Sequence, residues 1–228
     1  MKHSTITIIA IATTIFLSMC GQGEENSSTE ASVPEETVWG IDISHHQGII
    51  KWDRMNSRRP DFIFMKATEG STFTDPRFKE YRAEAKKLGI PVGAYHFFSY
   101  RSSGESQANH FLKTVKDQEL ELPLVIDLEF SRKMLPAYKL RQEIRNFVNV
   151  VKKSTGKAPM FYGECGYYER YVKGWSVVPY LWISSMEGPP ICDHNFWQKT
   201  ERFSHPSFVG RIDYNEFNGL REELLTLN

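Results

Sequence analysis

The chain has 228 residues, and its 28 lysines and arginines balance 28 aspartates and glutamates, so the formal net charge is zero. This balance excludes the basic surface that nucleic-acid binding needs, and a content of 40% hydrophobic and 13% aromatic residues excludes a wholly disordered chain. Three cysteines are too few for a disulfide-stapled miniprotein, and the length predicts one large α/β domain or two small ones.

Residues 1–19 have the pattern of an export signal. Lys2 gives a short positive start, and residues 5–19 form an almost wholly apolar run without a charge. This run is shorter than the roughly 20 residues that cross a bilayer, and its length suits the apolar core of a signal peptide.

The end of this segment resembles the lipobox of bacterial lipoproteins, in which the cysteine becomes the first mature residue and carries lipid. The residues are Leu17, Ser18, Met19 and Cys20. Met19 departs from the pattern, which prefers a small residue there, so soluble secretion is the alternative. Lipid on Cys20 would hold the protein at a bacterial membrane or cell surface through acyl chains alone. Residues 20–37 are nearly free of apolar side chains and predict a flexible acidic tether.

From residue 38 onward, strand-like apolar runs alternate with segments of helical period. The predicted strands cover residues 38–43, 61–66, 91–98, 122–128, 158–162, 180–184, about 194–197 and 208–213. The predicted helices cover about 76–88, 105–118 and 140–153, with weaker signals at 164–173 and 220–227. The first helix has Asp75 at its N-cap, Pro76 at its first position and Gly89 after its end.

This alternation implies a parallel sheet, and eight strands allow the sheet to close into a barrel. We find no internal repeat and no second linker, so residues 38–228 are predicted to form one domain. Periodicity alone does not separate a barrel from an open, doubly wound sheet. No Gly-rich phosphate loop follows the first strand, and no cofactor is predicted.

The most informative strand ends in two carboxylates, Asp127 and Glu129. A spacing of two places both side chains on one face of a strand. Two acids this close repel each other when ionised, so the pKa of one should rise. A raised acid beside a charged carboxylate is the pair that acid-assisted glycoside cleavage uses. The alternative is a pair of hydrated acids where the strand meets solvent.

Two further aspartates occupy comparable positions. Asp42 lies at the end of the first predicted strand, and Asp213 lies at the end of the last. In a closed barrel the first and last strands are neighbours, so these carboxylates would meet at the rim where barrel active sites lie. Each aspartate alone is more typical of a loop or turn, and the coincidence over three strands favours a site.

Aromatic side chains stand near the ends of several strands and suit stacking on sugar rings. They are Tyr95, Tyr162, Trp182 and Trp197. Each one singly is more often part of a protein core than of a ligand site. The set as a whole is typical of a carbohydrate site.

The ordered series of motifs resembles glycoside hydrolase family 25, the Chalaropsis-type lysozymes. The motifs are Gly40-Ile-Asp-Ile-Ser-His-His-Gln-Gly48, Phe62-Ile-Phe-Met-Lys-Ala-Thr-Glu-Gly70, Gly93-Ala-Tyr-His-Phe97, Asp127-x-Glu129, Leu181-Trp-Ile183, Trp197-Gln198 and Asp213-Tyr-Asn215. The resemblance covers nearly all of residues 38–228. It implies an irregular TIM-like α/β barrel of eight strands with about five helices, of the (β/α)5(β)3 type. It also implies cleavage of the β-1,4 bond from N-acetylmuramic acid to N-acetylglucosamine in peptidoglycan, by a protein that we expect to be a monomer.

The same resemblance implies roles for single residues. Glu129 corresponds to the general acid, and Asp127 corresponds to the partner that orients the reacting acetamido group of the sugar. Asp42 and Asp213 correspond to supporting acids. Substrate contacts are expected from Tyr95, Tyr162, Trp182, Trp197, Gln198 and Asn215. We favour the sugar's acetamide as the nucleophile, with net retention, and an inverting route with Asp42 or Asp213 as the base stays open.

Other chemistry-bearing residues have plainer interpretations. Lys66 is expected to pair with an acid in the barrel or to close a strand. His45 and His46 would point to opposite faces of a strand, and without partner ligands they predict no metal site. Export permits a disulfide between Cys165 and Cys192, but two free thiols are equally consistent with the spacing.

Two other functions remain open from the sequence. One is a wall-binding protein that kept the site without turnover, which the presence of all four acids disfavours. The other is a glycosidase of the same fold that acts on a different N-acetylhexosamine polymer, which only assays on chitin and peptidoglycan would separate.

Overall fold

The computed structural model describes residues 37–174 and 178–227. The predicted export signal, the lipid attachment at Cys20 and all but the last residue of the tether lie outside the described residues. The described residues belong to one compact unit. Within the described ranges, no helix has both the length and the apolar character that crossing a bilayer requires.

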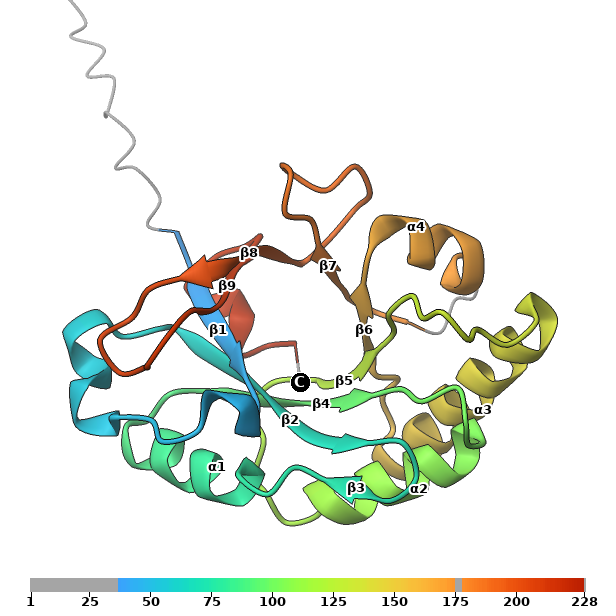
Figure 1. Cartoon of the computed structure of the whole chain (residues 1–228), viewed down its shortest axis with the longest axis horizontal. Helices are drawn as coiled ribbons and strands as arrows, with labels where there is room; N and C mark the ends of the chain where they lie inside the picture. The colour runs from blue at the N-terminus through green and yellow to red at the C-terminus, as the bar shows by residue number, and fades with distance from the viewer. Residues whose placement is uncertain (1–36, 175–177, 228) are drawn as a thin grey trace, which may run out of the picture. The chain divides into compact units, whose positions relative to one another are not determined.

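Eight strands close into a barrel around an aromatic core (Figure 1). They are β1 (Trp39–Ile43), β2 (Phe62–Glu69), β4 (Val92–Phe97), β5 (Leu124–Asp127), β6 (Met160–Gly163), β7 (Leu181–Ser184), β8 (Phe196–Phe203) and β9 (Ile212–Phe217). Strand β1 closes the barrel because it pairs in parallel with β2 and antiparallel with β9. The two-residue strand β3 (Phe73–Thr74) pairs only with β2. The barrel predicted from the resemblance is confirmed.

The three long helices lie on one side of the barrel. In Figure 1, α1 (Phe78–Lys87), α2 (Gly104–Val115) and α3 (Ala137–Thr155) lie along the strands β2, β4 and β5, whereas β7, β8 and β9 have no helix between them. The shorter elements are the 3-10 helices η1 (His45–Gln47) and η2 (Trp52–Arg58), the helix α4 (Cys165–Tyr167), which continues into the π-helix η3 (Tyr168–Val172), and α5 (Arg221–Leu224).

Two apolar clusters flank the barrel wall because successive side chains of a strand point to opposite faces. The inner cluster fills the barrel with rings that include Phe62, Phe64, Trp182 and Phe196. The rings of Phe64 and Trp182 stack with their centroids 4.7 Å apart. The outer cluster lies between the strands and the helices. Aromatic rings thus fill the interior of the barrel.

Two glycines make room for the inner rings. A Cβ atom on Gly40 would overlap the Phe62 ring, and one on Gly93 would overlap the Phe64 ring. Both glycines belong to the motifs that predicted the family. Their role in the fold is to leave space for the aromatic rings inside the barrel.

The last predicted strand is wrong in position and direction. The apolar run 208–213 is mostly a loop, in which Val209 is 81% exposed and Gly210 has a φ of 94°. The strand is β9 instead, and it runs antiparallel to both β1 and β8.

The start of the first helix also differs, since α1 begins at Phe78 rather than at Pro76. The Asp75 carboxylate accepts a hydrogen bond from the Arg77 backbone N–H at 2.9 Å and so stabilises the turn that precedes the helix. The 3-10 helices η1 and η2 were not predicted, because their residues show no helical hydrophobic period.

Candidate active site

The strands bring the four predicted acids to one rim of the barrel. Asp42 is the second-to-last residue of β1, and Asp127 is the last residue of β5. Asp213 is the second residue of β9 and pairs in register with Asp42. Asp213 was predicted to end a strand. It begins one, and it still reaches the rim because β9 runs antiparallel to β1.

Asp42 is held by a layer of buried amides directly above the aromatic core. Its Oδ2 accepts hydrogen bonds from Gln198 Nε2 at 3.0 Å and from Asn215 Nδ2 at 2.8 Å. Gln198 Oε1 in turn accepts from the Tyr162 hydroxyl at 2.8 Å, and Asn215 Oδ1 accepts from Trp182 Nε1 at 2.8 Å. Every amide in this layer is satisfied on both sides, so the Asp42 carboxylate has a fixed orientation.

Asp42 and Asp213 form a coupled pair of acids. Burial raises the pKa of Asp42, while its hydrogen bonds from Asn215, Gln198 and Asp213 act in the lowering direction. Burial and the negative charge of Asp42 raise the pKa of Asp213 to about 8. At neutral pH the pair therefore shares one proton, which Asp213 carries, and the Asp213 O–H donates a hydrogen bond to the Asp42 carboxylate.

Asp127 is as buried as Asp42 but lacks its partners. The residue is 5% exposed, and its Oδ1 is buried without a hydrogen-bond partner. Burial and the nearby charge of Glu129 raise its pKa well above the ordinary value, and Lys66 acts in the lowering direction. A buried carboxyl oxygen without a partner is costly unless something else completes its bonding, and a substrate N–H would do so.

Glu129 lies beyond the end of β5, and its side chain is exposed. Partial desolvation and the charge of Asp42 raise its pKa, and Lys66 again acts in the lowering direction. The sequence placed Asp127 and Glu129 on one face of a strand. The structure ends the strand at Asp127 but keeps the two carboxyl groups close enough to influence each other electrostatically.

Lys66 pairs with an acid, as one of its two interpretations expected. Its Nζ donates to Glu69 Oε2 at 2.7 Å and lies 4.7 Å from the centre of the Phe97 ring. Glu69 lies in the motif Phe62–Gly70, but no pattern in the sequence singles it out. A β-bulge between Lys66 and Thr68 shifts the register, so the alternation that predicts which side chains face inward does not hold there.

The predicted substrate-binding residues fall into two groups. Tyr95 and Tyr162 are on the same inner face as the acids, and the charges of Asp42 and Asp127 act on both hydroxyls. Gln198, Asn215 and Trp182 lie in the buried layer under Asp42, with exposures of 4%, 0% and 2%. These three side chains support the acid and have no open face for a sugar.

Trp197 differs from the rest of the predicted set. It neighbours Gln198 on β8 and so points to the opposite face of the strand. Its indole Nε1 donates to the Ser185 carbonyl at 2.8 Å, and Lys199 Nζ lies 4.8 Å from the ring centre. The structure therefore does not bring Trp197 together with the acids.

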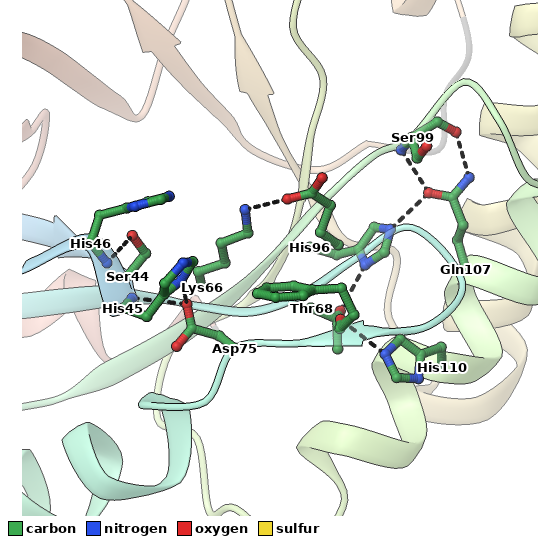
Figure 2. Close-up of polar contacts among 12 residues, drawn as sticks. Ser44, His45, His46, Lys66, Thr68, Asp75, His96, Ser99, Gln107 and His110 are labelled. Atoms are coloured by element: carbon green, nitrogen blue, oxygen red, sulfur yellow. Dashed lines mark hydrogen bonds and ion pairs between the residues drawn. The ribbon is translucent and has the colours of Figure 1, made fainter. Parts of the chain in front are cut away.

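The two histidines after β1 lie on the 3-10 helix η1 and not on a strand, so their rings are not on opposite faces (Figure 2). Their ring centroids are 4.0 Å apart. His45 Nδ1 and its backbone N–H both bond to Asp75 Oδ2, at 2.8 and 2.9 Å. No group of three or more potential metal ligands occurs among the described residues.

The structure pairs Cys165 with Cys192 in a disulfide. This bond joins α4 to the loop between β7 and β8, and it decides between the two possibilities that the sequence left open.

The barrel also has a cavity of about 940 Å³ away from the acids. It is lined by side chains near the ends of α2 and α3 and the start of β5, among them Leu112, Leu124 and Tyr180. None of the four acids lines this cavity. The candidate active site is therefore located by the position of the acids and not by the cavity.

Comparison with known proteins agrees with this geometry. Residues 41–208 match the family model described as glycosyl hydrolases family 25. The chain is 36% identical over 197 residues to the uncharacterized protein YegX of Escherichia coli K12, covering 82% of this chain and 72% of that protein. It is 30% identical over 209 residues to Lysozyme M1 of Streptomyces globisporus, covering 83% and 71%.

A solved structure extends the comparison to three dimensions. A family 25 glycosyl hydrolase from Bacillus anthracis superposes with a TM-score of 0.75 at 32% identity, covering 83% of this chain and 92% of that one. Sequence, fold and the carboxylates at the barrel rim thus agree, and this chain belongs to glycosyl hydrolase family 25 and is a glycoside hydrolase.

Proposed function

We propose that this protein is a muramidase that hydrolyses the β-1,4 bond between N-acetylmuramic acid and N-acetylglucosamine in peptidoglycan. Family membership and similarity to a lysozyme support peptidoglycan as the substrate. The observation that carries the proposal is the contrast within one pair of acids. Asp127 is buried with an unpartnered oxygen, while Glu129 beside it is exposed.

Each acid of this pair suits one task in the cleavage. Glu129 has a raised pKa and reaches solvent, so it can hold a proton and donate it to the oxygen of the glycosidic bond. The free oxygen of Asp127 can accept the N–H of the sugar's 2-acetamido group. That hydrogen bond orients the acetamido carbonyl oxygen toward the anomeric carbon and favours the ionised form of Asp127.

In the first step the acetamido oxygen bonds to the anomeric carbon, the glycosidic bond breaks, and the proton of Glu129 moves to the leaving hydroxyl. In the second step water attacks the cyclic intermediate, and the Glu129 carboxylate takes the water's proton. Two displacements at one carbon give net retention, and Glu129 recovers its proton.

The protonation of Asp213 and the burial of Asp42 disfavour an inverting route. A general base must be ionised at the working pH, whereas the pKa of Asp213 is raised to about 8. Asp42 is largely buried and accepts two amide hydrogen bonds, so a water molecule has little access to it. We assign Asp42 and Asp213 to supporting the site.

We further propose that the protein is exported, works as a monomer, and is tethered through lipid on Cys20 followed by the acidic segment 20–37. The apolar run 5–19 and the lipobox-like residues 17–20 support this location. Metabolic labelling with a radioactive or clickable fatty acid tests it, because a Cys20→Ser variant should lose the label while keeping the enzymatic activity of its barrel.

The experiment for the activity is digestion of purified peptidoglycan, borohydride reduction of the products and mass spectrometry. Newly formed, reduced N-acetylmuramic acid ends are expected. Reduced N-acetylglucosamine ends would make the protein a glucosaminidase on the same scaffold. No release by a demonstrably folded protein, together with release from chitin, would move the substrate to another N-acetylhexosamine polymer.

A further inference from the structure

The backbone that carries Glu129 is beyond the support of the barrel sheet. Strand β5 ends at Asp127, and the last hydrogen bond to a neighbouring strand is from the Leu128 N–H to the Tyr162 carbonyl at 3.0 Å. The Leu128 carbonyl lies so close to Gly163 that a Cβ atom there would overlap it. Beyond Leu128, something other than a strand must hold the chain.

A tyrosine from a different loop supplies this contact. The Tyr100 hydroxyl donates a hydrogen bond to the backbone carbonyl of Glu129. It also lies 3.0 Å from the Tyr167 hydroxyl. Since Tyr100 has one hydroxyl hydrogen and uses it on Glu129, Tyr167 is the donor to Tyr100.

The environment keeps these hydroxyls in their donor state. Burial raises the pKa of Tyr100 to about 12, and the neighbouring charges of Asp127 and Glu129 act in the same direction. Tyr167 is fully buried, and its ring packs edge-on against Phe130 at 5.1 Å. The residue after Glu129 is thus held by Tyr167 through its ring, and Glu129 itself is held by Tyr100 through a hydrogen bond.

The loop that carries Tyr100 is fastened to helix α2 by one side chain, as Figure 2 shows. Gln107 Oε1 accepts the Ser99 backbone N–H at 2.8 Å, and Gln107 Nε2 donates to the carbonyls of Ser99 and Ser102 at 2.8 and 3.0 Å. These three bonds bracket Tyr100 on both sides. A loop pinned at both flanks loses the freedom that would otherwise move its hydroxyl.

Gln107 is itself fixed by a buried histidine. His96 Nε2 lies 3.0 Å from Gln107 Oε1, and His96 Nδ1 lies 2.7 Å from the Thr68 hydroxyl. Burial lowers the pKa of His96 to about 3, so the ring is neutral and carries one proton. Because an amide oxygen can only accept, that proton is on Nε2, and Thr68 donates to Nδ1. This assignment leaves every polar atom of the network satisfied.

We infer that Tyr100 is a positioning residue for Glu129, held in place from α2 by Gln107 and from α4 by Tyr167. This inference rests on the proposed role of Glu129 as the general acid. The hydroxyl fixes the carbonyl of Glu129 at the point where the strand no longer does, and so sets where its carboxyl group meets the glycosidic oxygen. A displacement of about 1 Å at such a group is enough to cost up to about 10²-fold in rate.

The test is Tyr100→Phe, which removes only the hydroxyl. We expect kcat to fall about ten-fold with KM unchanged, because the position of the acid matters in the transition state and not in substrate binding. The thermal midpoint should fall by a few degrees, since the ring stays in place but the buried Tyr167 hydroxyl loses its acceptor. The fall should be smaller for Tyr167→Phe, which removes only the second hydroxyl of the chain.

The pH profile provides a readout that a structural role would not move. The charged groups that face Glu129 are Asp42, Asp127, Asp213, Glu164 and Lys66, and Tyr100→Phe changes none of them. A Glu129 side chain that relaxes toward solvent loses part of the desolvation that raises its pKa. The basic limb of kcat/KM should therefore move to lower pH in Tyr100→Phe.

Tyr138→Phe is the matched control, because Tyr138 is 78% exposed at the start of α3, and it should leave kcat and the pH profile unchanged. Glu129→Gln is measured alongside. If Glu129→Gln is inactive while Tyr100→Phe keeps wild-type kcat and pH profile, the positioning role is overturned. It is also overturned if kcat and the thermal midpoint fall together without a shift of the basic limb. Full activity of Glu129→Gln would instead overturn the proposed function on which the inference rests.

Discussion

The two pairs of acids at the barrel rim differ in how the protein satisfies them. Asp42 accepts two amide hydrogen bonds and a third from the protonated carboxyl group of Asp213. Asp127 has an oxygen without a partner, and the described contact of Glu129 with Tyr100 is made by its backbone carbonyl and leaves its carboxyl group open. A carboxylate oxygen that accepts hydrogen bonds from the protein is held in one orientation. A carboxylate oxygen without a protein partner can accept a hydrogen bond from a substrate. The first pair thus supports the site, and the second pair is the one that we expect to react.

Among substitutions in the two pairs of acids, Glu129→Gln should reduce turnover the most. The amide has nearly the same shape but cannot donate a proton to the leaving oxygen, so turnover should fall by about 10²–10⁴-fold. The fold and sugar binding should persist, since the side chain is exposed. Release of reducing ends from peptidoglycan measures the rate.

Glu164→Gln is the control for that substitution. Glu164 is exposed, its charge acts on Glu129, and it makes no side-chain cap to α4. Wild-type turnover by Glu129→Gln would refute the assignment of the acid, while a comparable loss in both variants would indicate a general effect of charge.

Asp127→Asn should have the next largest effect. The asparagine keeps the size of the side chain but weakens the electrostatic support of the acetamido group, and a single such contact is worth about 10²–10³-fold in kcat. KM should change little because the effect is greatest in the transition state. Asp53→Asn, at an exposed position in η2, is the control. A rise in KM with unchanged kcat would show that Asp127 only binds the sugar.

Much of this contrast could be predicted from residue type and order. Apolar runs placed six strands close to their observed positions and reached only the first two residues of β8, and strand closure correctly joined Asp42 to Asp213. Even the misplaced last strand led to the right pairing. Asp213 was put at the end of a strand, and it begins an antiparallel one that arrives at the same rim.

The remainder depends on contacts between distant segments. Nothing near Tyr100 indicates that its hydroxyl meets a carbonyl 29 residues later. The burial of Gln198 and Asn215 under Asp42 was equally hidden, because a polar residue at a strand end is normally exposed. Such residues were assigned to the substrate by their family positions, whereas their hydrogen bonds show them holding an acid.

Asn215→Leu tests that distinction with a smaller effect. The substitution leaves the Trp182 N–H without an acceptor and takes one donor from Asp42, and a buried unsatisfied group costs about 1–3 kcal/mol. We expect a lower thermal midpoint and a lower kcat, with KM near the wild-type value. Asn149→Leu, at an exposed position of α3, controls for the change of side chain. A dominant rise in KM would return Asn215 to the substrate-binding set.

The smallest expected effect is a pH-dependent change in stability in Asp213→Asn. An unfolded aspartate has a pKa of about 3.9, and the pKa of Asp213 is raised to about 8 in the folded protein by burial and by Asp42. The folded state therefore binds the proton more tightly, and the stability that this provides is complete below about pH 4 and is lost as the pH rises toward 8. Asparagine does not ionise, and at every pH its amide N–H can donate to Asp42 in place of the carboxyl O–H of Asp213. The thermal midpoint of the variant should match the wild type near pH 4 and exceed it by about 2–4 °C at pH 8, a shift of the size that 1 kcal/mol produces in a domain of this length.

Thermal unfolding at intervals from pH 4 to pH 8 measures the difference, and Asp193→Asn, exposed in the loop before β8, controls for loss of one charge. Parallel curves for Asp213→Asn and the wild type would mean that Asp213 ionises normally, which would make it available as a base and reopen the inverting route.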